Sequence, residues 1–394
     1  MASAKKNRQI HINQEAYSTL MLIQNQIFSK FNSLMNEKEI DEVMKTEHLN
    51  DEFMPYAFIF APGGKRNQEV IQSAKKDEII DLIRDNKIVG TIKVKTNFKY
   101  KNSWKTRSVF GANSISTSIG NHLQGKYCLS GEINIFNTKI KEIKDKIYGL
   151  KKELNLKKVT ALMLSANPFH RVHERLIRMT IDKADMIIIF LIRSSKENSL
   201  NFELRLKTLK YFVNNFLPRK KAIIIPLKNT PLFTGHKSPI LECISAYKFG
   251  ANKFVIGQNH SAIGMFFNKN QAHSITDKIG KNFDLEILVM PEYVYCHECK
   301  TIVSTKTCPH GQHRHMKYHS STLRELLYSG ILPPPILMRK EISAIILSDL
   351  FPNRFKNLQK IYDELFSNQG ILETHTYEDF YKELAILYQT SSLT

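Results

Sequence analysis

The stretch VTALMLSANPFHRVH, residues 159–173, joins a short apolar run to a polar turn and a pair of histidines. Its first six residues have the length and composition of a buried strand. Asn167 is a good N-cap residue, and Pro168 suits the first helical position because its missing N–H costs nothing there. The stretch therefore predicts a strand, a turn and a helix, with the free N–H groups of the helix start able to attract an anion.

His170 and His173 are three residues apart, so a helix would place both imidazoles on one face of its first turns. Such a pair could donate hydrogen bonds to phosphate oxygens and stabilise the charge that builds on a bridging oxygen as pyrophosphate leaves. Taken alone, an H-x-x-H spacing is more often a pair of exposed or core histidines. Its position directly behind a buried strand and an Asn-Pro turn favours the functional interpretation.

Similar apolar runs recur through the middle of the chain, with helix-period segments between several of them. The runs are Val159–Leu164, Met186–Ile192, Ala222–Leu227, Phe254–Ile256 and Leu285–Met290. Strands that alternate with helices predict an α/β fold whose parallel sheet is covered on both faces. Ligands bind beyond the carboxyl ends of such strands. A glycine and a histidine, Gly257 and His260, follow the fourth run at such an end.

The flanking regions have a different character. Residues 1 to 136 are β-rich, with strand-like alternation at 88–95 and 130–136. Apolar residues at steps of three and four predict an amphipathic connecting helix within 137–158. The residues after about 320 read as helical. We therefore expect three domains, at 1–136, 137–325 and 326–394.

The composition indicates a globular protein with no membrane span. The chain has 394 residues, 42% of them hydrophobic and 24% charged. Its longest clean apolar run has about seven residues, whereas a membrane helix needs about 20. The N-terminus lacks the apolar core of a secretory signal, so a cytoplasmic protein is expected. The net charge of +20 either marks an anionic partner or reflects lysines spread over the whole surface.

The five cysteines do not suggest a disulfide framework, because their number is odd and three of them fall within thirteen residues. The spacing is Cys296-x2-Cys299-x8-Cys308-x4-His313. Three thiolates and one imidazole complete a tetrahedral Zn²⁺ site with no open position, which predicts a structural zinc loop over 296–313. His310 is a rival for the fourth position, although it follows Cys308 closely.

Together, in this order, these motifs resemble the ATP sulfurylase (sulfate adenylyltransferase) family. The resemblance covers about 140 to 345, and the stretch from Val89 to Phe136 is similar to the end of the family's PUA-like N-terminal domain. It implies a Rossmann-like nucleotidyltransferase domain with a parallel sheet, a β-rich PUA-like N-terminal domain and a small helical C-terminal domain. The stretches that carry it are 165–173, 257–262, 307–311, 321–327 and 339–342.

The resemblance also implies a reaction and a set of site residues. The family transfers the adenylyl group of Mg-ATP directly to sulfate, which gives adenylyl sulfate and pyrophosphate. The implied residues that hold ATP and stabilise the transition state are Asn167, His170, His173 and His260. The implied substrate-binding residues are Ser165, Gly257, Gln258, Asn259, Ser261 and Arg339.

The chain departs from the family pattern where the family contacts sulfate. Two family arginines are replaced by Ala166 and Gln258, while Ser165 and Asn259 replace a glutamine and an aspartate. A hydrogen bond to a charged group contributes about 1.5–3 kcal/mol, so losing two would weaken sulfate binding by roughly 10²–10⁴-fold. Arg171 and Arg193 are the candidates to compensate.

Three functions are therefore open: adenylyl transfer to sulfate, nucleotidyl transfer to another acceptor, or a catalytically silent nucleotide-binding protein. The expected partners are ATP with Mg²⁺ and an oxyanion. A nucleic-acid partner ranks last, because it rests on net charge and the zinc loop alone. No membrane partner is expected, and a homo-oligomer is left open.

Overall fold

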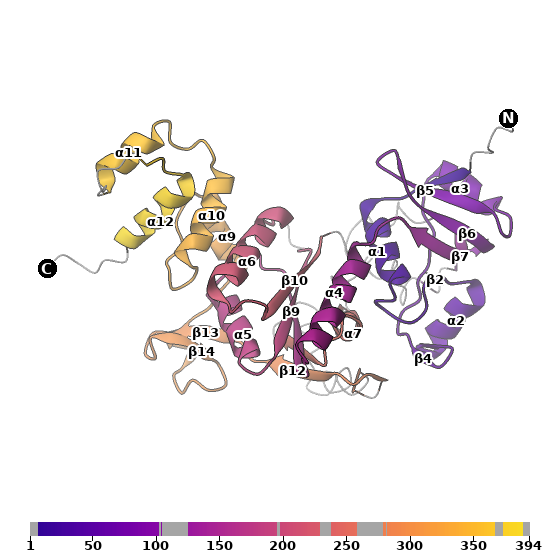
Figure 1. The fold of residues 1–394 in the computed structure, drawn as a ribbon, viewed down its shortest axis with the longest axis horizontal. Helices are drawn as coiled ribbons and strands as arrows, with labels where there is room; N and C mark the ends of the chain where they lie inside the picture. The colour runs from indigo at the N-terminus through magenta and orange to yellow at the C-terminus, as the bar shows by residue number, and fades with distance from the viewer. Residues whose placement is uncertain are drawn as a thin grey trace. The chain divides into compact units, whose positions relative to one another are not determined.

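The computed structural model describes residues 7–101, 104, 125–194, 198–228, 238–257, 279–280, 282–366 and 373–388 (Figure 1). By internal packing these residues divide into two compact units. One unit is built from the chain up to 161 together with 238–256 and 282–288, and the other from 162–228 and 289–388.

The N-terminal part is a mixed five-stranded sheet in the order β1-β5-β6-β7-β2. The strands are β1 (Arg8–His11), β2 (Ser33–Leu34), β5 (Ile79–Arg84), β6 (Lys87–Lys99) and β7 (Tyr127–Ile135). The two alternating stretches that predicted strands lie within β6 and overlap β7. A core that includes Ile10, Leu82 and Ile92 packs beneath the helices α1 (Gln14–Gln24) and α3 (Lys65–Gln72). Helix α2 (Glu37–Thr46) and the hairpin of β3 (His48–Leu49) and β4 (Glu52–Phe53) complete this part.

The five apolar runs form one five-stranded parallel sheet in the order β10-β9-β8-β11-β12. Its strands are β8 (Val159–Leu164), β9 (Met186–Ile192), β10 (Ala222–Leu227), β11 (Lys253–Gly257) and β12 (Glu286–Met290). Every residue of β8 and β9 is buried, as expected of strands covered on both faces. The α/β fold class is thus confirmed.

Helices connect the strands as the alternating pattern predicted. They are α4 (Lys139–Glu153), α5 (Arg171–Ile181), α6 (Phe202–Phe216) and α7 (Ser238–Lys248). Helix α5 packs on β9, and α6 packs on β10. The strand order reverses between β8 and β11, and in sheets of this kind the crevice at the carboxyl ends of those two strands is where ligands bind.

The C-terminal part begins with a three-stranded antiparallel sheet in the order β14-β13-β15. Its strands are β13 (Tyr293–Cys296), β14 (Thr301–Ser304) and β15 (His315–Met316), with the short helix η5 (Gln312–Arg314) before the last. Four helices follow: α9 (Ser320–Tyr328), α10 (Lys340–Leu350), α11 (Leu358–Leu365) and α12 (Tyr377–Leu387). Within the described residues, no helix has the length and apolar character that crossing a membrane requires.

Candidate active site

The turn after β8 is held by the side chain of Asn167, which is 3% exposed. Its amide nitrogen donates to the hydroxyls of Ser194 and Ser199, both at 3.0 Å, and its amide oxygen accepts from the backbone N–H of Leu200 at 3.0 Å. The prediction that Asn167 caps the helix is therefore wrong. Helix α5 begins at Arg171, because the side chain of Asn167 is engaged by the segment that follows β9.

Beneath this turn, Arg205 of α6 is buried and donates to three backbone carbonyls. Its Nη1 reaches the carbonyls of Ser165 and Ile192, and its Nε reaches that of Leu200. These carbonyls belong to the ends of β8 and β9 and to the segment before α6. Burial lowers the pKa of Arg205 to about 10, so the guanidinium still carries its charge near neutral pH.

His170 and His173 come together at the start of α5, with ring centroids 3.9 Å apart. The backbone N–H of His170 donates to Nδ1 of His173 at 3.2 Å, which leaves the proton of the neutral His173 ring on Nε2. Burial lowers the pKa of His173 to about 4. Burial, with the neighbouring His173, also holds the pKa of His170 well below its ordinary value. Both rings are therefore neutral at physiological pH.

Two features make this helix start suitable for an anion. Helix α5 has eleven residues and presents its positive dipole end here, while the backbone N–H of its first residue, Arg171, donates to the carbonyl of Leu337. The second feature is Nδ1 of His170, which is buried and has no hydrogen-bond partner among the described residues. Such orphaned polar atoms are uncommon in folded proteins, so a functional reason is expected.

Charged side chains of α5 pair with each other and with Arg339, the residue before α10, close to the same turn. Arg339 makes a bidentate contact with the buried carboxylate of Glu174, at 2.8 and 3.2 Å, and lies 3.8 Å from the ring centroid of Phe216. Arg171 donates to Glu174 and to the carbonyl of Pro335. The described contacts of Arg339 are thus with protein groups, and its contact with substrate stays a prediction.

The second predicted loop is only partly described. Gly257 is the last residue of β11. Gln258, Asn259, His260 and Ser261 lie outside the described residues. On the first loop, Ser165 is exposed at the end of β8, and the following Ala166 is fully buried with a left-handed φ of 45°.

The predicted metal ligands gather in the turns around β13 and β14. Ligand atoms of Cys296, Cys299, Cys308 and His310 all lie within 4.8 Å of one another. Nδ1 of His310 is 3.3–3.6 Å from the three sulfurs, and the sulfurs of Cys299 and Cys308 are 3.8 Å apart. A tetrahedral Zn²⁺ would need S–S distances of about 3.8 Å and S–N distances of about 3.5 Å. The donor set and its spacing therefore fit zinc.

The imidazole in this group belongs to His310, whereas the cysteine spacing predicted His313 as the fourth ligand and His310 as its rival. His313 lies in η5 and is exposed, with its ring over Gly311. The turn Cys308-Pro309-His310 brings the ring of His310 back over the sulfurs, so the close spacing that counted against this residue is no obstacle. Nε2 of His315 lies 3.3 Å from the sulfur of Cys308 and can act as an outer hydrogen-bond partner.

Sequence reasoning missed several residues that build the site. Ser194, Ser199, Glu174 and Arg205 carry no motif that a single sequence makes visible. For Arg205 there was one signal: it falls on the apolar stripe of its predicted helix, four residues before Leu209.

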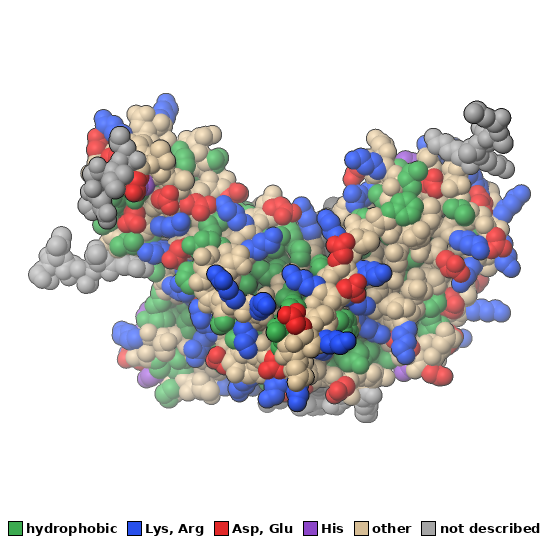
Figure 2. Space-filling view, viewed as in Figure 1, with side chains coloured by type: hydrophobic (Ala, Val, Ile, Leu, Met, Phe, Trp, Pro, Cys, Tyr) green, Lys and Arg blue, Asp and Glu red, His purple; other side chains and the backbone are tan. Residues whose placement is uncertain are grey.

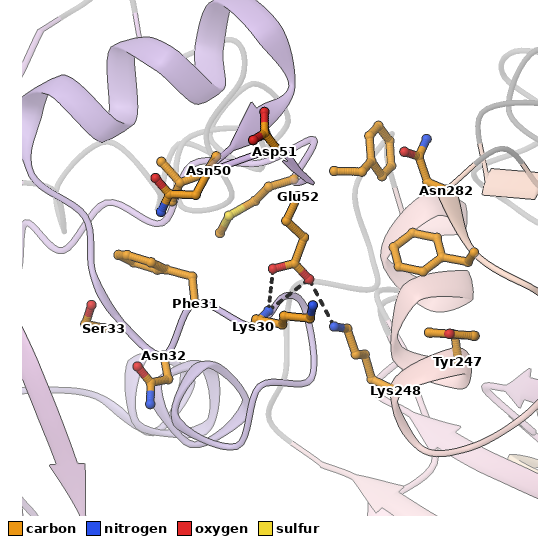
Figure 3. A pocket seen from close by; sticks show the side chains of 14 residues that line it. Lys30, Phe31, Asn32, Ser33, Asn50, Asp51, Glu52, Tyr247, Lys248 and Asn282 are labelled. Atoms are coloured by element: carbon orange, nitrogen blue, oxygen red, sulfur yellow. Dashed lines mark hydrogen bonds and ion pairs between the residues drawn. The ribbon is translucent and has the colours of Figure 1, made fainter.

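A cavity of about 780 Å³ lies in the other unit, between the 30–33 loop, the β3–β4 hairpin and the end of α7 (Figure 3). Glu52 occupies its centre and accepts from the backbone N–H of Lys30 and from Nζ of Lys248 at 3.1 Å. None of the predicted site residues lines this cavity. It is not the candidate active site.

The comparisons with known proteins identify the family of the chain. A sequence model of the ATP-sulfurylase family matches residues 139–349, and a PUA-like domain matches residues 1–138. The chain is 24% identical to the sulfate adenylyltransferase of Persephonella marina over 362 residues, which cover 87% of this chain and 92% of that protein. It is 21% identical to the sulfate adenylyltransferase of Chloroflexus aurantiacus (strain J-10-fl) over 347 residues, which cover 86% and 90%.

Among solved structures, the hexameric APS kinase from Thiobacillus denitrificans matches with a TM-score of 0.63 at 13% identity. This match covers 89% of the chain but spans only 64% of that structure's length, and it supports the fold alone. The family match, in contrast, spans more than half of the chain and includes both the histidine pair and the cysteine cluster. The resemblance inferred from the motifs is confirmed: this chain belongs to the ATP-sulfurylase family, with a PUA-like domain at its N-terminus.

Proposed function

We propose that this protein binds Mg-ATP at the start of α5 and transfers its adenylyl group to an oxyanion, with sulfate as the first candidate acceptor. The observation that carries the proposal is the neutral pair of the buried His170 and the half-buried His173, which follows the carboxyl end of β8. The family membership and the strand reversal beside β8 support the same placement.

In the proposed reaction an acceptor oxygen attacks the α-phosphorus of ATP. The bond from that phosphorus to the bridging oxygen breaks, and pyrophosphate leaves with the bonding electrons. Nε2–H of His173 can donate to the oxygens that gain charge, and the positive dipole end of α5 favours that charge. Mg²⁺ bound with ATP would neutralise part of the phosphate charge.

Nucleotidyl transfer to a different acceptor is the second candidate. The loss of two arginines of the family pattern favours it. The family's sulfate contacts are absent at Ala166 and Gln258. Of the two arginines expected to compensate, Arg171 is bound to the carbonyl of Pro335 and to Glu174, whereas Arg193, exposed directly after β9, stays a candidate. The nearby Arg324 donates to the carbonyl of Asn167 at 2.9 Å. An acceptor with less need for two guanidinium groups would suit the described residues better.

The test is pyrophosphate release from Mg-ATP, with and without sulfate, on zinc-replete protein. Sulfate-dependent release would support the first candidate. ATP binding without release would move the proposal to another acceptor, and absence of ATP binding would reject it. The His173→Ala variant serves as the blank.

We also assign Zn²⁺ to the group of Cys296, Cys299, Cys308 and His310, where it would have a structural role because all four positions are taken by protein. All five cysteines lie in the described part of the chain and none forms a disulfide. This supports a reducing compartment, the cytoplasm, as the place of action.

A further inference from the structure

Four rings follow one another at the start of α5. The ring of Tyr318 stacks on His170 at a centroid distance of 5.5 Å and an interplanar angle of 29°. His170 contacts His173, and His173 stacks on Phe169 at 5.6 Å and 16°. The ring of Tyr318 therefore lies against one of the two histidines of the candidate site.

Tyr318 is also held at its far end. Its hydroxyl donates to the carbonyl of Ile336 at 2.8 Å. The carbonyls on either side, of Pro335 and Leu337, accept from Nε and from the backbone N–H of Arg171, the residue after His170. Three consecutive carbonyls thus bind Tyr318 and the helix start together, and this arrangement fixes the ring relative to α5.

The chain reaches Tyr318 directly from the cysteine cluster. In β15, His315 pairs with Cys296 of β13 and its Nε2 contacts the sulfur of Cys308. Only Met316 and Lys317 separate His315 from Tyr318. The position of this strand, and hence the point from which Tyr318 extends, depends on the folded cluster.

We infer that Tyr318 is a positioning residue that holds the imidazole of His170 in the orientation used for nucleotide chemistry, and that the metal-bound cluster keeps Tyr318 in place. The stacked ring covers His170 and limits rotation about its side-chain bonds. A side chain that stabilises a charged transition state has to be held in one orientation in this way. The catalytic consequence rests on the proposed function, whereas the orientation of His170 does not.

Two substitutions separate the ring from its hydroxyl. Tyr318→Phe keeps the stack and loses the bond to Ile336, whereas Tyr318→Leu loses both. Tyr328→Leu is the control, because Tyr328 is exposed on α9. Tyr318→Met, whose unbranched side chain also lacks a ring and adapts to irregular space, replaces Tyr318→Leu if that variant does not fold.

The first readout is the NMR titration of His170 in protein labelled with ¹⁵N-histidine and assigned with a His170→Gln variant. Tyr318→Leu should admit water and raise the pKa of His170 toward its ordinary value, while Tyr318→Phe and Tyr328→Leu should leave it unchanged. The other titratable groups at this helix start, on His173, Arg171 and Glu174, are the same in all these variants. Removing the metal from unsubstituted protein with a chelator should move the His170 signal in the same direction as Tyr318→Leu.

The second readout is pyrophosphate release, where Tyr318→Leu should lower kcat about tenfold or more with little change in the KM for ATP, and Tyr318→Phe should recover most of it. An unchanged His170 titration in Tyr318→Leu would overturn the positioning role. An unchanged titration after metal removal would overturn the part played by the cluster. If unsubstituted protein neither binds ATP nor releases pyrophosphate, the proposed function fails, and the NMR result still decides this inference.

Discussion

The position of one proton decides what His173 can do. Since its Nδ1 accepts from the backbone of His170, the neutral ring carries its proton on Nε2 and acts as a hydrogen-bond donor. Replacing His173 or His170 by alanine should lower the rate of pyrophosphate release by about 10²–10³-fold, the usual cost of a donor to developing charge. His11→Ala, on an exposed residue of β1, is the control. Activity retained in either active-site variant would remove that histidine from the mechanism.

Arg205 provides a second test at the scale of a single residue. Methionine at this position would keep much of the volume but leave three backbone carbonyls, two of them fully buried, without their donor. Because each such loss costs about 1–3 kcal/mol, Arg205→Met should lower the free energy of unfolding by about 3 kcal/mol or more in urea titrations. Lys210→Met, on an exposed residue of the same helix, should stay within about 0.5 kcal/mol of the unsubstituted protein. Equal effects of the two changes would contradict the role given to Arg205.

Among the structural elements, the cysteine loop offers a test of which histidine, His310 or His313, is the fourth zinc ligand. The purified protein should contain about one zinc ion per chain. His310→Ala should lose most of that zinc and destabilise the β13–β15 sheet, because binding energy at such sites is folding energy. His313→Ala should retain it, since His313 lies outside the group. Metal analysis after extensive dialysis gives the answer, and the opposite pattern would restore His313 as the ligand.

The elements themselves were largely predictable, for a physical reason. A strand buried on both faces must be apolar along its whole length. The run Met186–Ile192 therefore predicted β9 from its own residues, with no information from the rest of the chain. The start of α5 was not predictable in the same way. Asn167 has the side chain of an N-cap, but its partners Ser194 and Ser199 lie some thirty residues away, and such distant contacts override local preference.

At the scale of the whole molecule, the limit of sequence reasoning is distance along the chain. His170 and His173 were visible because a local motif holds them. Tyr318, which contacts the same helix start, lies about 150 residues further on and carries no pattern that links it to the histidines. Arg339, which binds Glu174 of the same helix, was reached only through the family resemblance. The charge was similarly uninformative: on the face shown in Figure 2, Lys and Arg side chains are scattered among Asp and Glu, in line with the interpretation of spread lysines. The division into three domains at 136 and 325 stays a prediction.

His170 and His173 also make the stability of the whole chain depend on pH. Both have a pKa lowered by burial, that of His173 to about 4, while an unfolded chain would protonate them near 6.5. The unfolded state therefore binds more protons below that value, and stability that is fully present above about pH 6.5 is lost as the pH falls toward 4. Two such groups give a slope of up to about 2.7 kcal/mol per pH unit.

The measurement is the free energy of unfolding in urea between pH 7 and pH 4.5, with the double variant below as the control for carboxylates that begin to titrate at the lower end. Unsubstituted protein should lose several kcal/mol over this range, roughly 3 kcal/mol or more. A double variant, His170→Gln with His173→Gln, should show a much flatter profile, because glutamine cannot take up a proton. Saturating Mg-ATP should also flatten the profile, since a bound polyphosphate favours the protonated imidazoles and raises their pKa in the folded state. A steep slope that persists in the double variant would mean that the pH dependence arises elsewhere, and that burial of this pair is not what holds it neutral.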